Sequence, residues 1–220
     1  MTPGLYLDAN ATEPLRPEAR AAMLAALDAG GNPSSVHADG RAARRRLEGA
    51  RSVLAARFGA EVVWTSGGTE ANALALHGLG QGRRILAGAT EHAAILAAAP
   101  QARILPVDPD GRVVLAAVEE ALRGPPALVC LMAANNETGV LHPMDQVAEL
   151  CRAAGALLHV DAIQSVGRLG FDLAASGADS AALSAHKLGG PPGAGALLLR
   201  PGLHIPPLIA GGGQERGRRG

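Results

Sequence analysis

The chain has 220 residues, 20 basic and 20 acidic side chains, 48% hydrophobic residues and 2% aromatic residues. The high apolar content excludes a disordered chain, and the neutral charge with few aromatic residues excludes the basic, base-stacking surface of a nucleic-acid-binding protein. No apolar run reaches the ~18 residues of a membrane helix and no secretion signal opens the chain, so we expect a cytoplasmic protein that binds no membrane.

Short apolar runs alternate with helical patterns along the chain. In order, the pattern predicts helix 17–28, helix 39–58, strand 61–65, helix 69–79, strand 84–87, helix 92–98, strand 103–107, helix 114–122, strand 127–132, helix 144–154, strand 156–160, strand 180–183 and strand 194–199. Because these strands lack polar–apolar alternation and helices separate most of them, we expect an α/β fold, a mostly parallel sheet with helices on both faces. The short loop 189–193 favours an antiparallel position for the last strand.

A glycine-rich loop follows the strand 61–65. Ligands of open parallel sheets bind beyond the carboxyl ends of the strands, where helix N-termini face them. Here Gly67 and Gly68 allow the backbone to approach an anion closely, and the Thr69 hydroxyl with the first free N–H groups of the helix can bind a phosphate. The alternative is an ordinary strand–loop–helix turn in which Thr69 is the N-cap.

Two further residues stand at strand ends. Asp161 follows the strand 156–160, where a buried carboxylate needs a partner such as a protonated heterocyclic nitrogen; the alternative is a helix N-cap. Lys187 follows the strand 180–183 and is the only lysine in the chain, so any covalent chemistry of a side-chain amine depends on it. The alternative is a solvated surface charge.

Other polar residues also follow strands: His92, Asn136, Gln164, Ser184 and His186. His92 can stack on a planar ring, and Asn136 can bind a ring hydroxyl. A phosphate-binding loop, an acid for a ring nitrogen and a Schiff-base lysine are together the parts that pyridoxal 5′-phosphate requires. The remaining histidines show no metal-ligand spacing, so we predict no metal site and a structural role for His37, His77, His142, His159 and His204.

Short motifs follow one another in a fixed order: Tyr6–Thr12, Gly31–His37, Thr65–Glu70, Thr90–His92, Asn135–Val140, His159–Ala162, Gln164–Gly167, Ser184–Lys187 and Gly211–Gly217. This ordered set resembles the cysteine desulfurases, class V members of the fold-type I pyridoxal-phosphate enzymes. The resemblance implies an N-terminal arm at 1–15 and a cofactor-binding large domain at 16–220, incomplete at its C-terminus, with the C-terminal small domain absent.

The resemblance also implies roles for individual residues. Lys187 would bind the cofactor as a Schiff base and move protons, with His92 stacked on the ring as a second catalytic residue. Asp161 would pair with the ring nitrogen. The ring hydroxyl would contact Asn136 and Gln164. The phosphate would be held by Gly68, Thr69, Ser184 and His186.

The implied reaction converts L-cysteine to L-alanine and passes the sulfur to a protein cysteine as a persulfide, for iron–sulfur cluster or thiocofactor synthesis. Its implied partners are a sulfur-acceptor or scaffold protein and a second copy of the chain in a homodimer. Cys130 and Cys151 fall in a predicted buried strand and helix, so we predict that neither is the nucleophile, which in the family lies further downstream. The alternatives are another class V activity, a selenocysteine lyase or an aminotransferase, and a non-catalytic remnant that binds the cofactor or a partner subunit.

Overall fold

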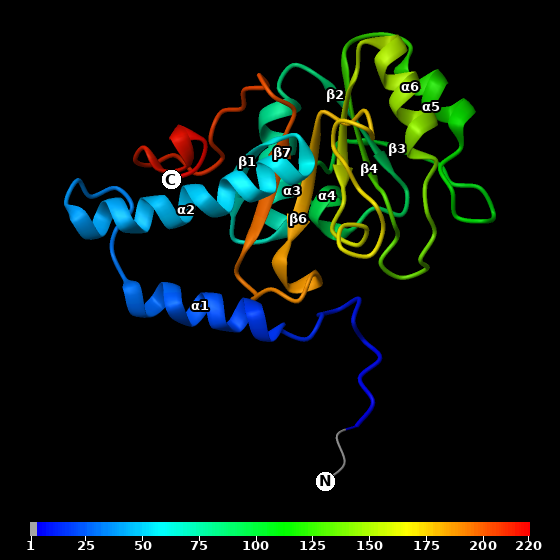
Figure 1. Cartoon of the computed structure of the whole chain (residues 1–220). Coiled ribbons are helices and arrows are strands. Elements are labelled where there is room, and N and C mark those ends of the chain that lie inside the picture. The colour runs from blue at the N-terminus through cyan, green and yellow to red at the C-terminus, as the bar shows by residue number, and fades with distance from the viewer. Residues whose placement is uncertain (1–3) are drawn as a thin grey trace.

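A central sheet of seven strands organises the computed structural model, which describes residues 4–220 (Figure 1). Its strands are β1 (Glu61–Thr65), β2 (Arg84–Gly88), β3 (Arg103–Leu105), β4 (Ala127–Met132), β5 (Leu157–Asp161), β6 (Ser180–Ser184) and β7 (Gly195–Leu199). Its helices are α1 (Pro17–Ala29), α2 (Ala38–Phe58), α3 (Gly68–Leu79), α4 (Ala93–Leu96), α5 (Leu115–Leu122) and α6 (Met144–Ala154), with 3₁₀ turns at Ala185–Lys187 and Gln214–Gly217.

The strand order across the sheet is β1-β7-β6-β5-β4-β2-β3. The neighbours among β2 to β6 pair in parallel, whereas β7 runs antiparallel to both β1 and β6. The predicted mostly parallel sheet is therefore confirmed, and so is the antiparallel strand after the loop 189–193. This topology directs the carboxyl ends of β1, β2, β4, β5 and β6 to one edge of the sheet.

Helices cover both faces of the sheet, as predicted. On one face α3 and α4 bury side chains such as Leu74 and Ile95 against the sheet. On the other face α2, α5 and α6 bury side chains such as Phe58, Val118 and Val147. Each fully buried side chain of this size contributes about 1.5–3 kcal/mol relative to an exposed one, so the sheet provides a rigid base for the loops at its edge.

Two predicted elements are shorter in the structure. The strand predicted at 103–107 ends at Leu105, because Pro106 has no N–H for the ladder. The helix predicted at 92–98 extends only over Ala93–Leu96, and Pro100 follows soon after. None of the helices within residues 4–220 combines the length and the apolar character needed to cross a membrane.

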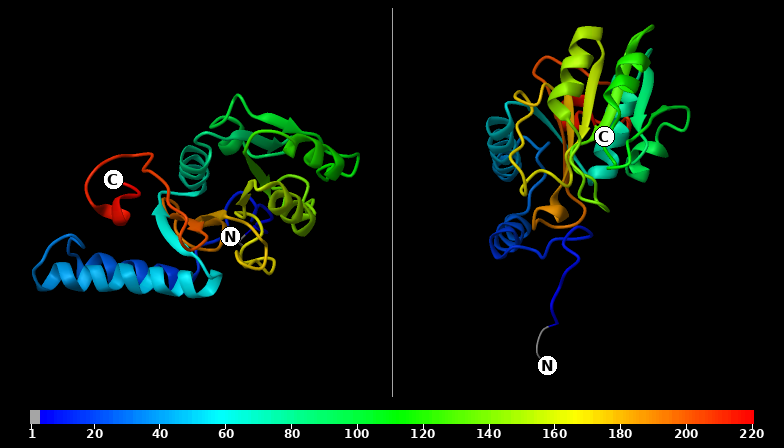
Figure 2. Two further views of the ribbon diagram at one scale, coloured as in Figure 1. Left: turned by 90° about the horizontal axis from the view of Figure 1, so that it is seen from above. Right: turned by 90° about the vertical axis from the view of Figure 1, so that its right-hand side faces the viewer.

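The two ends of the described chain lie on different sides of the sheet. Helix α1 lies apart from the sheet and fully buries none of its residues, so apolar side chains that predicted it remain exposed, Leu27 to 70% (Figure 1). Residues 211–220, which we call the C-terminal segment, lie beside β1 and α2 in the left view of Figure 2, and Glu215 contacts both elements.

Candidate active site

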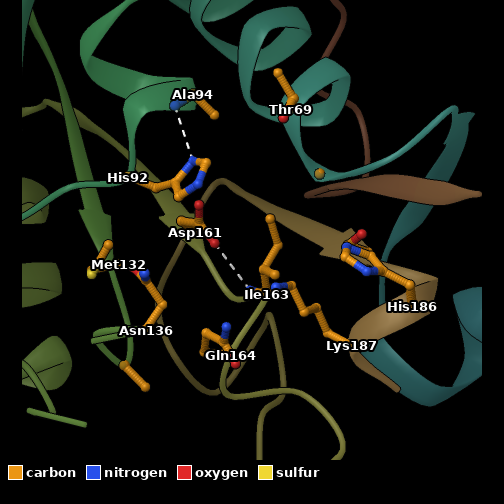
Figure 3. A pocket seen from close by; sticks show the side chains of 13 residues that line it. Thr69, His92, Ala94, Met132, Asn136, Asp161, Ile163, Gln164, His186 and Lys187 are labelled. Atoms are coloured by element: carbon orange, nitrogen blue, oxygen red, sulfur yellow. Dashed lines mark hydrogen bonds between the residues drawn. The ribbon is translucent and has the colours of Figure 1, made fainter. Parts of the chain in front are cut away.

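A cavity of about 210 Å³ opens where the carboxyl ends of the parallel strands meet (Figure 3). Its lining includes every residue that the sequence singled out: Gly68, Thr69, His92, Asn136, Asp161, Gln164, Ser184, His186 and Lys187. They come from the ends of five strands that are far apart in sequence. The rest of the lining was not predicted, because apolar wall residues carry no chemical signature: Ala94, Met132, Ala134 and Ile163.

The glycine-rich loop after β1 forms one wall of the cavity. Gly67 is the N-cap of α3 and has no side chain to bond the free N–H groups, so the alternative that made Thr69 the N-cap is wrong. A methyl group on Gly68 would overlap the Cδ1 atom of Ile163 and lie 3.4 Å from the Cβ atom of Ser184. A larger residue at this position would therefore require Ile163 to move, and the open helix N-terminus suits a small anion.

Asp161 is the last residue of β5 and lies 6% exposed at the cavity floor. Its Oδ1 accepts from the Ile163 N–H at 3.0 Å and its Oδ2 from the Asn72 amide at 2.8 Å. No helix begins after it, so the N-cap alternative is wrong. Burial raises the pKa of Asp161, and the two N–H donors, followed by His92 and Lys187, oppose that rise. Within residues 4–220 this carboxylate forms no ion pair within 4.0 Å, which leaves it open to a cationic ligand atom.

Lys187 ends the 3₁₀ turn after β6 and projects into the cavity (Figure 3). Its half-buried amine donates to the backbone carbonyls of Asn10 at 2.6 Å and Ala11 at 2.9 Å, so it is not a freely solvated surface charge. Burial, followed by the positive charge of Arg168, lowers the pKa of Lys187. A larger share of the amine is therefore neutral at a given pH, as a nucleophilic lysine requires.

The N-terminal arm crosses the mouth of the cavity. Besides its contacts with the lysine, the Asn10 carbonyl accepts from Gln164 at 3.0 Å, and the Asn10 amide donates to the Asn136 carbonyl at 3.3 Å. The Thr12 hydroxyl lies 3.1 Å from His186 Nδ1. The prediction assigned no role to these arm residues, because most of the contacts use backbone atoms; the motif Tyr6–Thr12 was the only signal.

His92 lies at the rim as the N-cap of α4. Its Nδ1 accepts from the Ala94 N–H at 3.0 Å, and the ring lies next to Asp161 (Figure 3). Because Nδ1 is an acceptor, the neutral ring carries its proton on Nε2. The imidazole is thereby fixed in one orientation at the cavity.

The two cysteines lie away from this cavity, and both are buried. Burial, with the charge of Glu91 second, raises the pKa of Cys130 well above its usual value. Burial raises the pKa of Cys151 to about 12. Raised pKa values favour the neutral thiol, which is a poor nucleophile, and the two cysteines lie in the strand and the helix that the sequence predicted for them.

The C-terminal segment is attached by arginine–carboxylate pairs. Glu215 forms two hydrogen bonds with Arg51, at 2.7 and 2.9 Å, and accepts from the Trp64 N–H at 2.9 Å. Arg219 pairs with Glu70 in the first turn of α3. That glutamate also accepts from the N–H and hydroxyl of Ser66, at 2.7 and 2.6 Å. The segment is thus connected through Glu70 to the loop that forms the cavity wall.

Comparison with known proteins places these features in one family. The sequence profile of the aminotransferase class-V family matches residues 5–217. A cysteine desulfurase of Cereibacter sphaeroides is 45% identical over 98% of this chain and 60% of its own length, and an IscS-like cysteine desulfurase of Mycobacterium tuberculosis is 42% identical over 96% of this chain and 59% of its own. The chain therefore spans about three fifths of the length of these curated relatives.

Solved structures with the same fold include a NifS-like protein of Rickettsia africae, with a TM-score of 0.93 and 34% identity over 98% of this chain and 63% of that one. A second is SspA in complex with cysteine, with a TM-score of 0.91 and 30% identity over 99% of this chain and 68% of that one. These similarities extend over the whole sheet and all of the loops that line the cavity.

Proposed function

The chain belongs to the class V aminotransferase family, and we propose that it acts as a cysteine desulfurase dependent on pyridoxal 5′-phosphate. The observation that carries this proposal is the meeting, in one cavity, of a buried carboxylate without a cation, a glycine-lined helix N-terminus and the only lysine amine of the chain. Enzymes of this family depend on pyridoxal phosphate.

The residues of the cavity fit the three ends of that cofactor. Asp161 would pair with the protonated ring nitrogen and so compensate its own buried charge. The Gly68 backbone and the Thr69 hydroxyl, at the N-terminus of α3, would hold the phosphate, with Ser184 and His186 beside them. The amine of Lys187 would hold the aldehyde carbon covalently.

When bound, pyridoxal phosphate supplies an electron sink that stabilises negative charge at the α-carbon of an amino acid. The chain's own contribution is to place and move protons around that carbon. Lys187 Nζ, with its lowered pKa, would accept the α-proton and return it, and the carbonyls of Asn10 and Ala11 would hold that amine between these events. Asp161 would keep the ring cationic throughout.

For the substrate we propose L-cysteine, which the names of the relatives and the cysteine complex of SspA support. The sulfur acceptor would be a thiol other than Cys130 and Cys151, since neither forms a thiolate at physiological pH. A second copy of the chain and an iron–sulfur scaffold protein are the partners that this activity implies.

The test is a titration of the purified 220-residue chain with pyridoxal phosphate, followed by visible absorbance, with L-cysteine added afterwards. We expect a new absorbance band that shifts when cysteine is added, and release of alanine once a small thiol is added to accept the sulfur as a persulfide. Reduction with borohydride and peptide mapping should place a pyridoxyl group on Lys187.

Lys187→Arg is the matched variant, because it keeps the positive charge but removes the primary amine. It should bind the cofactor reversibly and yield no adduct on any peptide that contains position 187. Absence of a band in the unmodified chain, or an adduct confined to another amine, would overturn the proposal.

A further inference from the structure

A chain of hydrogen-bonded side chains continues from Asp161 into the interior of the protein. The Asn72 amide of α3, which donates to Asp161, lies with its Oδ1 2.9 Å from His159 Nε2. On the other side of the imidazole, His159 Nδ1 lies 2.8 Å from the hydroxyl of Ser180 on the neighbouring strand β6. All three residues behind Asp161 have no solvent exposure, so no water competes for these bonds.

The chemistry of the groups fixes the direction of every bond. A carboxylate only accepts, so the Asn72 nitrogen faces Asp161 and the Asn72 oxygen must accept from His159 Nε2–H. Burial lowers the pKa of His159 to about 3, so the ring is neutral and carries this single proton. Its Nδ1 must then accept from the Ser180 hydroxyl. Each hydrogen in the chain thus points toward Asp161.

The other ionisable groups around Asp161 act in the same sense. The positive charge of Lys187 favours the ionised carboxylate from the cavity side. Glu91 is the nearby carboxyl group, and burial raises its pKa well above the usual range although the Met132 N–H opposes this. A raised pKa favours the protonated form of Glu91, which lessens its repulsion of Asp161. The main obstacle to ionisation of Asp161 is burial itself, which raises its pKa and which the N–H donors of Ile163 and Asn72 oppose.

We propose that Asn72, His159 and Ser180 are positioning residues that keep Asp161 ionised and aimed into the cavity, and so keep the ring nitrogen of the bound cofactor protonated. This inference rests on the proposed function for its ligand. The alternative is that the same hydrogen bonds only stabilise the protein interior, in which case their loss would change stability but not the protonation of the ring.

The first measurement needs neither cofactor nor variant. Imidazole nitrogen resonances of His159 in the ¹⁵N-labelled chain should show a neutral ring with the proton on Nε2, unchanged between pH 5 and 9. A proton on Nδ1 would reverse the donor and acceptor roles in these hydrogen bonds, and titration within this range would break them. Either result would overturn the proposal.

The second measurement uses pyridoxal phosphate labelled with ¹⁵N in the ring, whose chemical shift reports protonation of the bound ring nitrogen. Asn72→Leu removes the donor to Asp161 and should reduce the protonation constant of the ring nitrogen at least tenfold, about one pH unit. Ser180→Ala removes only the far end of the chain and should produce a smaller change in the same direction.

Ser165→Ala is the matched control for Ser180→Ala. Ser165 is also a buried serine and follows the cavity residue Gln164 directly, but its hydroxyl donates to the Ala162 carbonyl, which is not part of this chain of hydrogen bonds. It should leave ring protonation unchanged. Equal protonation in the unmodified chain, Asn72→Leu and Ser180→Ala would overturn the inference and leave the proposed function intact, whereas a chain that binds no cofactor overturns both. If Asn72→Leu does not fold, the comparison of the two serine variants decides.

Discussion

The first two turns of α3 are held in two different ways. On its inner side, Asn72 joins a buried and uncharged chain of hydrogen bonds that ends at Asp161. On its outer side, Glu70 is fixed by Arg219 of the C-terminal segment, one of several ion pairs at the surface of that segment. Buried neutral donors keep a fixed electrostatic environment, whereas surface ion pairs respond to salt and pH. If pyridoxal phosphate binds as proposed, its ring protonation and its phosphate binding would be controlled from opposite sides of one helix.

The largest effect is expected from removing the charge on the inner side. Asp161→Asn keeps the size of the side chain but cannot stabilise a protonated ring nitrogen, so loss of the α-proton from a bound amino acid should slow by roughly 10²–10³-fold. Exchange of that proton for deuterium, followed by NMR in deuterated water, measures the step directly. An exchange rate within twofold of the unmodified chain would exclude a role for the carboxylate.

The next largest effect is expected on the outer side, at the most buried pair of the C-terminal segment. The side chains of Arg51 and Glu215 are only 7% and 9% exposed. Glu215→Gln removes the more buried of the two carboxylates that pair with Arg51 and leaves only Glu48, so it should lower the free energy of unfolding by roughly 2 kcal/mol, measured by urea denaturation. The control is Glu119→Gln, which breaks an exposed pair with Arg123 and should cost under about 1 kcal/mol. Equal losses in both variants would contradict the prediction.

A third variant separates the two sides. Glu70→Gln keeps the bonds from Ser66 but loses the charge that holds Arg219, so the cavity wall should loosen and the Kd for pyridoxal phosphate should rise by up to about tenfold. Ring protonation should not change. Asn72→Leu should do the reverse, with a larger change in ring protonation than in phosphate affinity. If both variants altered both properties equally, the division between the two sides of α3 would not hold.

The smallest effect is expected on the pH dependence of stability, through Glu61 and its pair with Arg218. The Gly202 N–H first, and then the Arg218 guanidinium, hold the pKa of Glu61 below its usual value of 4.5. Because the folded-state pKa is below the unfolded one, the stability from this pair is present above about pH 4.5 and is lost as the pH falls through the lowered value. Glu61→Gln should therefore be less stable than the unmodified chain by under about 1 kcal/mol at pH 7, and the difference should shrink in urea titrations as the pH falls below 4.5. A constant difference would contradict it.

The sequence was sufficient to predict the sheet, the antiparallel strand and the residues around the cavity. The reason is physical: in an open parallel sheet the residues that follow buried strands converge at one edge, whatever the details of packing. Asp161 and Lys187 could be found in this way because Asp161 comes directly after an apolar run and Lys187 four residues after one. The alternatives, a helix N-cap for Asp161 and a solvated surface charge for Lys187, were excluded only by the structure. It shows which groups form hydrogen bonds with the carboxylate and with the amine.

The remainder depended on features without a sequence signature. The carbonyls of Asn10 and Ala11 at Lys187 are backbone atoms, which every residue has. The contact of His159 with Ser180 depends on the register of β5 against β6. Strands that are buried on both faces lack the polar–apolar alternation from which a register could be predicted. For this reason His159 was predicted as structural, although it stands two residues before Asp161.

The position of β7 has a consequence for how the chain folds. Within the sheet β1 has β7 as its one neighbour, and β7 is inserted between β1 and β6 although it comes last in sequence. The loop Ser66–Thr69 therefore cannot reach its final place until residues made far later on the ribosome have been inserted beside it. The parallel strands β2 to β6 can pair with one another before β7 has been synthesised. Pairings over long sequence distances form slowly, so the ability to capture a ligand should arise as one of the last events of folding.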